Sequence, residues 1–280
     1  MEYMDHESVL KMLPDRPVDS HKGNYGKIFL LCGSRGYTGA AALAAMGALR
    51  CGAGLVYLAV PESIYEIEAI KLLEPIVLPL PDKGGKLSTK ATSSIAGCLE
   101  GKDAVLVGPG LDSSDGVDAA VRFILETYSG PIVLDADGIN AARKHKDVLR
   151  ERTYPTILTP HAGEFARLTG FKVKDRHTDA VKLANDLGCI VLLKGHQTVI
   201  TDGNTTYINT TGNPGMAVGG SGDILSGMIV SLLGQGLEPL MAAACAAWLH
   251  GAAGDLCASE YGQYGMLPSD MLYILPRLLK

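Results

Sequence analysis

The sequence has 280 residues, of which 47% are hydrophobic and 20% are charged, and its formal net charge at pH 7 is −5. This much apolar surface can be buried in a core, so the composition excludes a disordered chain and fits one large α/β domain or two small ones. The densest basic stretch, residues 143–146, is short, so we expect no nucleic-acid partner.

We expect no targeting or membrane segment. Residues 1–13 are acidic and lack the apolar core of a signal peptide. The longest apolar stretches, such as residues 40–49, are too short and too interrupted by glycine to span a bilayer. Six cysteines are scattered along the chain without a Cys-x-x-Cys pair, and most have apolar neighbours. This pattern predicts reduced core cysteines in a cytoplasmic protein.

Short apolar runs alternate with longer amphipathic segments along the chain. The expected buried strands are residues 27–32, 55–60, 75–80, 104–107, 132–134, 156–158 and 189–193, with prolines restricting 75–80 to a sheet edge. The expected helices are residues 39–51, 63–73, 88–99, 116–128, a helix from 138, a helix ending at 169, and 178–187. Residues 198–202 and 205–209 flank Gly203-Asn204, a hairpin signal, and helices follow at 220–233, 239–259 and 268–279.

Strand and helix alternation with almost continuous apolar strands is typical of a mostly parallel sheet covered by helices on both faces. No linker, composition shift or internal repeat divides the chain. We therefore expect one three-layer α/β/α domain over residues 1–280, with residues 1–20 as an N-terminal extension. In such sheets the ligand lies beyond the carboxyl ends of the strands. The segments GSRGYTG, GPG, DAD, TPHAGE and KGHQT each follow a predicted strand.

A glycine-rich segment, NPGMAVGGSGD at residues 213–223, leads from the predicted hairpin into a helix. Backbone N–H groups at a helix N-terminus can form an anion hole, and glycine lets the backbone approach a phosphate closely. Asp223 in the first turn could be only an acid favoured by the helix dipole. The whole segment favours a functional role for Asp223.

Other phosphate-binding and nucleophile motifs do not fit this sequence. No Gly-Lys-Ser/Thr occurs, so a P-loop is absent. GSRGYTG does not have the Gly-x-Gly-x-x-Gly spacing of a dinucleotide-binding turn. GGSGD ends in Asp223 where a hydrolase elbow, Gly-x-Ser-x-Gly, needs glycine.

Three further strand ends carry polar side chains. His161 and Glu164 in TPHAGE are either residues of a helix start or ligand contacts, and the strand-end position favours ligand contact. The KGHQT turn could clamp a nucleotide, with Lys194 near the phosphates. Asp135 and Asp137 could hold Mg²⁺, although Asp137 could instead cap the following helix. The seven histidines show no metal-ligand spacing, so we expect no zinc site.

These segments, in this order, resemble the NAD(P)H-hydrate dehydratase family, the carbohydrate-kinase-like YjeF C-terminal type. The resemblance runs from about Ser20 to Lys280 and is carried by HKGNYGKIFLLCGSRGYTGAA, GPGLDSS, VLDADGIN, LTPHAGEFARL, VLLKGHQTVI and NPGMAVGGSGDILSGMI. It implies a ribokinase-like fold and a lyase that repairs the hydrated cofactors NADHX and NADPHX. It also implies Mg²⁺ and a nucleotide co-substrate, ADP in most bacterial members and ATP in eukaryotic ones, with AMP and phosphate as the products from ADP.

The resemblance also assigns roles to individual residues. Asp223 matches the catalytic aspartate and a hydrate contact. Apart from the resemblance, Asp137 and Glu164 lie on different strand-end turns and could serve Mg²⁺ through water. The hydrate-binding positions are matched by Ala40, Ala41, Gly110 and His161. The nucleotide-binding positions are matched by Lys194, Gly195, His196, Gln197, Thr198, Gly219, Gly220, Ser221 and Gly222. Val218-Gly219-Gly220 departs from the small Thr-Ala-Gly that is usual in the family, which should not abolish the anion hole.

The resemblance further implies a homo-oligomer, commonly a tetramer. From the charge and the short apolar stretches we expect no nucleic-acid or membrane partner. We expect a stand-alone dehydratase, with a separate NAD(P)HX epimerase acting on the same pool. Two alternatives remain: a small-molecule kinase of the hydroxyethylthiazole or sugar type, and a nucleotide sensor without turnover. TPHAGE together with KGHQT favours the dehydratase over the kinase, and the intact Asp223 argues against the sensor.

Overall fold

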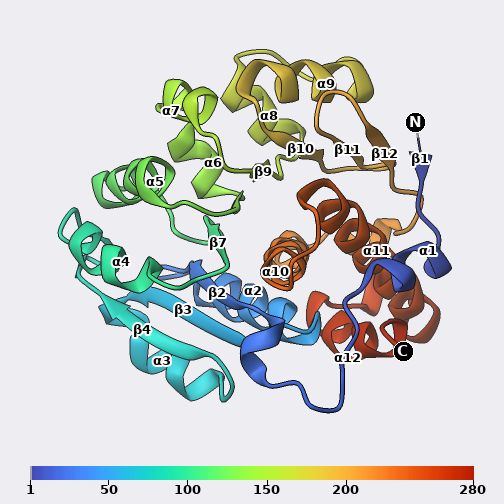
Figure 1. Cartoon of the computed structure of the whole chain (residues 1–280), viewed down its shortest axis with the longest axis horizontal. Helices are drawn as coiled ribbons and strands as arrows, with labels where there is room; N and C mark the ends of the chain where they lie inside the picture. The colour runs from blue at the N-terminus through green and yellow to red at the C-terminus, as the bar shows by residue number, and fades with distance from the viewer. Residues whose placement is uncertain (1) are drawn as a thin grey trace.

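A ten-stranded sheet forms the centre of the computed structural model, which describes residues 2–280 (Figure 1). The strand order is β1-β12-β11-β10-β9-β8-β7-β2-β3-β4. The strands from β10 to β4 in this order run parallel to one another. They are β2 (Lys27–Leu31), β3 (Leu55–Pro61), β4 (Ile76–Leu80), β7 (Ala104–Val107), β8 (Ile132–Leu134), β9 (Thr156–Leu158) and β10 (Ile190–Leu193). The mostly parallel sheet is therefore confirmed, and so is the edge position of the proline-containing strand.

The other end of the sheet begins with the predicted hairpin. β11 (Val199–Thr201) is antiparallel to β10 and to β12 (Thr206–Ile208). Beyond it β1 (Glu2–Tyr3) pairs in parallel with β12. The helix α1 (His6–Met12) follows, with Val9 fully buried and the His6 ring stacked on Trp248. The sequence pattern does not indicate β1 or α1, nor the small hairpin of β5 (Asp82–Lys83) and β6 (Lys86–Leu87).

Helices cover both faces of the sheet, which confirms the three-layer prediction. Successive residues of β2 point to opposite sides: Ile28 and Leu30 belong to one buried cluster, Phe29 and Leu31 to the other. The first cluster packs under α2 (Thr38–Arg50), α3 (Tyr65–Lys71), α10 (Ser221–Gly234), α11 (Pro239–Gly265) and α12 (Pro268–Leu278). The second packs under α4 (Ala91–Leu99), α5 (Asp115–Thr127), α6 (Asp137–Ala142), α7 (Lys146–Glu151), α8 (Ala162–Thr169) and α9 (Arg176–Leu187).

The helix α11 corrects one expectation from the sequence. It has 27 residues and is therefore much longer than the apolar stretch at residues 40–49. It is the one helix within residues 2–280 that is long and apolar enough to cross a membrane. However, 72% of its apolar window is buried inside the protein, as expected for a core helix. The prediction of reduced core cysteines is confirmed, because all six thiols are free and only Cys98 is not fully buried.

The helices α2 and α10 lie backbone against backbone near the centre of the molecule (Figure 1). A Cβ placed on Gly47 of α2 would lie 2.7 Å from the carbonyl oxygen of Ile224. A Cβ placed on Gly227 of α10 would lie 2.1 Å from the carbonyl oxygen of Ala44. The glycines thus allow this close approach, which fixes the start of α10 relative to the start of α2.

We expect Gly227→Ala and Gly97→Ala to change stability in opposite directions. At Gly227 the new methyl group overlaps the α2 backbone, so the free energy of unfolding should fall by about 1–3 kcal/mol. Gly97 lies inside α4 with nothing within 4 Å of its Cβ position. There the same substitution should raise the free energy of unfolding by about 0.5–1 kcal/mol. Urea unfolding of the two variants measures this, and equal shifts would contradict the packing account.

Candidate active site

Four charged side chains from different segments meet beyond the carboxyl ends of β8, β9 and β10. Lys194 Nζ lies 2.7 Å from Asp135 Oδ1 and 3.8 Å from Glu164 Oε2. The anion-hole segment reaches the same point, because a Cβ on Gly222 would lie 3.3 Å from Lys194 Nζ. Asp223 is the next residue, and its charge interacts with those of Asp135, Lys194 and Glu164. We call Asp135, Glu164, Lys194 and Asp223 the charge cluster.

Asp135 and Asp137 engage different neighbours, although both follow β8. Asp135 is almost fully buried and accepts hydrogen bonds from Lys194 and, at 2.8 Å, from Thr159 Oγ1. Asp137 is the first residue of α6 and accepts from the Asp112 backbone N–H at 2.8 Å. Ala136 between them has a φ of 46°, a strained value for alanine that turns the two carboxylates apart. Asp135 belongs to the charge cluster, whereas Asp137 organises the loop after β7.

His161 and Glu164 together form the start of α8. His161 Nδ1 accepts from the Gly163 N–H at 2.9 Å, and Glu164 Oε2 accepts from the His161 N–H at 2.8 Å. This is a reciprocal capping arrangement. It leaves the His161 side chain 52% exposed, while that of Glu164 is 6% exposed. The helix-start interpretation is correct for both residues, and the exposed His161 ring is still available to a ligand.

The KGHQT segment forms the turn between β10 and β11, as predicted. Gly195 has a φ of 153°, and its Cβ position lies 2.2 Å from the guanidinium of Arg176. Arg176 Nη1 donates to the Lys194 carbonyl at 2.8 Å, so this arginine supports the turn from α9. Sequence reasoning missed Arg176, which lies 18 residues before Lys194 without a motif around it. His196 and Gln197 are exposed at the tip.

The N-terminus of α10 has the properties of an anion site. Its N-cap residue, Gly220, has a φ of 101°, which favours glycine, and no side chain caps the helix. The N–H groups of the first turn have no partner within a helix, so they can bind an anion. Nothing lies within 4 Å of a Cβ placed on Gly219. The Val218-Gly219-Gly220 departure therefore leaves the helix start intact.

Three titratable groups border this helix start. Burial raises the pKa of Asp223 to about 6, with repulsion from Asp135 adding to the effect and Lys194 opposing it. Burial would lower the pKa of Lys194, but the charges of Asp135 and Glu164 raise it above its usual value. Burial lowers the pKa of His250, from α11, to about 4, and its Nε2 lies 3.4 Å from Ser221 Oγ. Sequence reasoning missed His250, which supports the anion site from beneath as a neutral ring.

The predicted hydrate-binding residues of two distant segments are brought together. A Cβ on Gly110 would lie 2.8 Å from that of Ala40, and a Cβ on Gly33 would lie 2.9 Å from that of Ala41. Cys32, directly before Gly33, is buried, and the charges of Asp223 and Asp135 help to raise its thiol pKa. The start of α2 and the loop after β7 therefore border the charge cluster.

Hard oxygen ligands suited to Mg²⁺ are present in the cluster. Magnesium in nucleotide enzymes is commonly held by one or two carboxylates, water and the phosphates. Asp135 Oδ2 lies 3.9 Å from the Cβ position of Gly222, facing the anion site, and Glu164 lies beside it. Within residues 2–280 no group of three or more histidine, cysteine or acidic side chains could hold a metal alone. The cluster therefore fits a magnesium ion that is held partly by these carboxylates and partly by the phosphate oxygens of a nucleotide.

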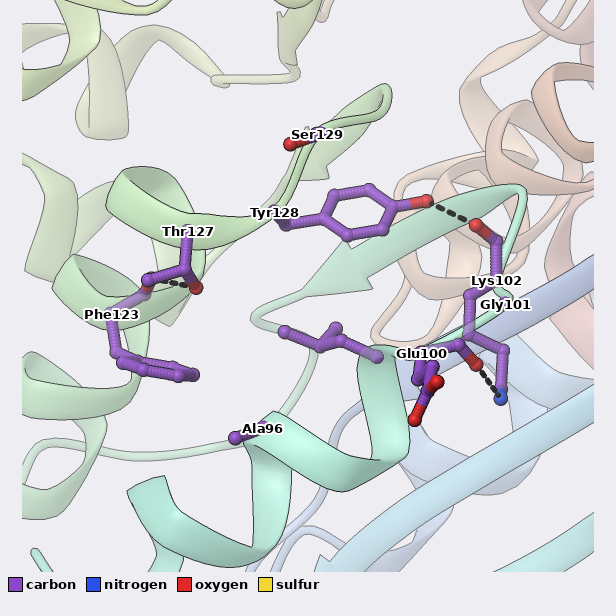
Figure 2. A pocket seen from close by; sticks show the side chains of 9 residues that line it. Ala96, Glu100, Gly101, Lys102, Phe123, Thr127, Tyr128 and Ser129 are labelled. Atoms are coloured by element: carbon purple, nitrogen blue, oxygen red, sulfur yellow. Dashed lines mark hydrogen bonds between the residues drawn. The ribbon is translucent and has the colours of Figure 1, made fainter.

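A hollow of about 430 Å³ lies at the opposite end of the sheet, before β7 and β8. Figure 2 shows the Tyr128 hydroxyl pointing at the carbonyl oxygen of Lys102, to which it donates at 2.9 Å. The Lys102 ammonium is engaged by the carbonyl of Glu100 at 3.0 Å. These polar groups are already satisfied, and parallel α/β sheets bind ligands at the carboxyl ends of their strands. We therefore take the charge cluster as the candidate active site.

Comparison with known proteins identifies the family of the chain. The sequence model of the family described as NAD(P)H-hydrate dehydratase matches residues 28–277. The chain is 44% identical over 275 residues to the bifunctional NAD(P)H-hydrate repair enzyme Nnr of Moorella thermoacetica, covering 96% of this chain and 52% of the relative. It is 38% identical to the ADP-dependent (S)-NAD(P)H-hydrate dehydratase of Bacillus subtilis, covering 99% and 98%. The chain spans about half the length of the first curated relatives that it matches.

Solved structures show the same architecture. A ribokinase-like protein of Enterococcus faecalis superposes with a TM-score of 0.87 at 27% identity, covering 99% of this chain and 94% of that one. The ADP/ATP-dependent NAD(P)H-hydrate dehydratase of Bacillus subtilis, co-crystallised with ATP and Mg²⁺, has a TM-score of 0.82 at 34% identity, covering 98% and 96%. With this ribokinase-like fold and the family match over residues 28–277, the chain belongs to the NAD(P)H-hydrate dehydratase family.

Proposed function

We propose that this protein uses a nucleotide, preferentially ADP, to dehydrate (S)-NADHX and (S)-NADPHX to NADH and NADPH. The observation that carries the proposal is the position of Asp223. This carboxylate, whose pKa is raised to about 6, lies in the first turn of an uncapped helix N-terminus beside Lys194. That arrangement pairs a proton acceptor with a phosphate-binding site.

The reaction needs both of these elements. The hydrate carries a hydroxyl on C6 of the reduced nicotinamide ring, which is a poor leaving group. Asp223 accepts the proton of this hydroxyl while the hydroxyl oxygen attacks the terminal phosphorus of ADP. The bond between that phosphorus and the bridging oxygen breaks, and AMP leaves. The lone pair of the ring nitrogen then expels phosphate, and loss of the C5 proton restores the dihydropyridine. The products are NAD(P)H, AMP, phosphate and a proton.

The protein supplies electrostatic stabilisation for the transferring group. The first-turn amides of α10 and the Lys194 ammonium face the charge that develops on the phosphoryl oxygens. Removing one donor of such an anion hole typically costs about 10²–10³ in rate. Asp135 and Glu164 would hold Mg²⁺, in part through water, and the ion would neutralise charge on the phosphates.

The pH dependence follows from the raised pKa of Asp223. A general base works only when deprotonated, so kcat/KM, which reports the free enzyme, should be at half its plateau near pH 6 and fall about tenfold per unit at lower pH. Asp135→Asn removes a negative charge that raises the pKa of Asp223. In this variant the loss of activity at acidic pH should therefore begin at lower pH than in the wild type. Rate profiles between pH 4.5 and about 8 measure both limbs. An unchanged limb in Asp135→Asn would exclude Asp223 as the titrating group.

We expect His161→Ala to weaken hydrate binding more than it slows chemistry. The exposed ring lies at the edge of the site, where Nδ1 accepts from the Gly163 N–H and Nε2 lies 3.4 Å from Glu164 Oε1, so we expect it to contact the hydrate while Asp223 takes the proton. KM for NADPHX should rise severalfold, with a smaller change in kcat. Loss of the N-terminal cap will cost about 1 kcal/mol of stability, which unfolding measurements can separate from the kinetics. A large kcat loss at constant KM would show that His161 acts in catalysis.

We further propose the setting in which the protein works. Its free, mostly buried thiols support a cytoplasmic location. Family resemblance supports a homo-oligomer, such as a tetramer, and Nnr relatives named as bifunctional support a link to an NAD(P)HX epimerase that acts on the same pool. Over residues 1–280 we propose a single catalytic domain.

Growth of the dihydronicotinamide absorbance band tests the function. The protein is mixed with Mg²⁺, NADHX and either ADP or ATP, and kcat/KM is compared for the two donors. We expect turnover, with ADP as the better donor. Preference for ATP would overturn the donor assignment, and no absorbance change with either donor would overturn the dehydratase assignment.

A further inference from the structure

A second hollow, of about 300 Å³, lies directly outside the proposed active site. Its walls come from the loop after β7 and from α5, α6 and α8. These elements follow the strands whose carboxyl ends carry Gly110, Asp135 and His161. The guanidinium-bearing residues of this wall are Arg143, at the end of α6, and Arg167, in α8. We call this hollow the arginine pocket.

Most charges in the arginine pocket are already compensated. Lys144 pairs with Asp118, and Asp112 pairs with Lys86. Asp137 accepts hydrogen bonds from the Asp112 N–H and, at 3.1 Å, from the Asn140 side chain.

Asp137, Arg143 and Arg167 have no ion-pair partner among residues 2–280. Throughout residues 2–280, no carboxylate forms an ion pair with Arg143 or Arg167. Arg167 lines the pocket and donates only through Nε, to Asn140 Oδ1 at 2.9 Å, so its two terminal nitrogens have no hydrogen-bond partner within residues 2–280. The pocket's charges without an ion-pair partner within residues 2–280 are therefore the two positive ones of Arg143 and Arg167 and the negative one of Asp137, which leaves a positive excess, although the whole chain carries −5.

The arginine pocket adjoins the ring-binding residues. A Cβ placed on Gly163 would lie 2.7 Å from His161 Cε1 and 3.7 Å from Arg167 Nη1, so the imidazole and the guanidinium flank the same backbone position. On the other wall, Asp112 follows Gly110 by two residues. Asp112 has a φ of 59° and is held there by Asp137 and Lys86, a strained conformation of the kind that collects at binding sites.

We propose that the arginine pocket binds a phosphate group of the dinucleotide substrate. The inference rests on the proposed function, because it places the nicotinamide ring between Gly110, His161 and Asp223. The remainder of the dinucleotide then leaves the site along the loops after β7 and β9. Arginine presents a planar fork that binds phosphate through two parallel hydrogen bonds, and Arg143 and Arg167 provide two such forks.

Two parts of the dinucleotide carry phosphate oxygens that an arginine can bind. The pyrophosphate bridge is common to NADHX and NADPHX, whereas the 2′-phosphate occurs only in NADPHX. The pocket would therefore either anchor both substrates or select NADPHX. Arginine-to-glutamine variants of Arg143 and Arg167 distinguish an anchor for both hydrates from a site that selects NADPHX.

The experiment compares Arg143→Gln and Arg167→Gln with a matched control, Arg122→Gln. Arg122 is an exposed arginine on α5 that pairs with Glu126, so its substitution changes the net charge equally. We expect KM to rise about tenfold for Arg167→Gln, with kcat nearly unchanged, because a charge-assisted hydrogen bond from an exposed guanidinium is lost. A rise for NADPHX alone identifies the 2′-phosphate, and a rise for both hydrates identifies the pyrophosphate. KM values equal to the control for both arginine variants would overturn the proposal.

A binding measurement separates this inference from the proposed function. Calorimetric titration of each variant with NADP⁺ and NAD⁺ requires no turnover. We expect the Kd for NADP⁺ to rise about tenfold in Arg167→Gln and not in Arg122→Gln. If the wild-type protein binds the dinucleotide through Arg167 but dehydrates neither hydrate, the proposed function fails and the arginine pocket stands. If it dehydrates both and the variants bind like the control, the pocket assignment fails alone.

Discussion

Asp223→Asn is expected to slow turnover by at least about 10²-fold while the protein stays folded and binds nucleotide. Asparagine has the size of aspartate and can still hydrogen-bond, but it is a very poor base, and loss of a general base usually costs about 10²–10⁴ in kcat. Stability at pH 7 should not fall below that of the wild type. Burial and the Asp135 charge raise the pKa of Asp223, so its charged form opposes folding above about pH 6.

The matched control for this variant is Asp115→Asn. Asp115 is likewise an acid in the first turn of a helix, α5, but it is exposed. Its neutralisation should cost the helix about 0.3–1 kcal/mol and leave turnover unchanged. Single-turnover rates and nucleotide titrations compare the two. Near-normal turnover by folded Asp223→Asn protein would reduce Asp223 to a residue of the helix start.

Lys194→Met is expected to have the largest effect on stability. Removing the ammonium leaves Asp135 buried without its ion-pair partner, and breaking a buried pair in this way costs about 3–5 kcal/mol. We expect the lower end, about 3 kcal/mol, because the Lys194 side chain is 20% exposed. The substitution also removes a charge that lowers the pKa of Asp223, so the acidic limb of activity should move to higher pH.

Urea unfolding at pH 7 measures the stability change. Lys172→Met, at an exposed lysine of the same domain, is the control and should change stability by less than about 0.5 kcal/mol. The double variant Asp135→Asn/Lys194→Met removes both charges and should recover much of the loss. A loss below about 1 kcal/mol in Lys194→Met would show that the pair is not held as a buried one.

Much of the fold could be predicted because the main elements have local signals. The strand at 27–32 is a continuous apolar run, and the observed strand, β2, is buried on both faces. The hairpin is marked by Gly203-Asn204. The strand β1 has only two residues and therefore no period to detect, although its partner β12 gives it a place in the sheet. The predicted end of the 239–259 helix falls short of Gly265 because α11 continues past Ser259 and then across a kink at Gly262, where φ is 73°.

The site was predictable where function depends on a continuous segment. The anion site at the start of α10 and the KGHQT turn are of this kind, and both lie where the sequence places them. The pairing of Asp135 with Lys194 joins residues 59 positions apart, and no local pattern encodes such a contact. Arg176 and His250 support the site from neighbouring helices, so they too are found only when the chain is folded.

The central claim is that Asp223 and the start of α10 use phosphoryl transfer to drive a dehydration. The most direct measurement follows the phosphorus products by ³¹P NMR together with the dihydronicotinamide absorbance, in one reaction with NADHX, ADP and Mg²⁺. The account predicts AMP, phosphate and NADH in equal amounts. A phosphorylated hydrate that accumulates with AMP, without phosphate release or NADH, would contradict it and identify a kinase.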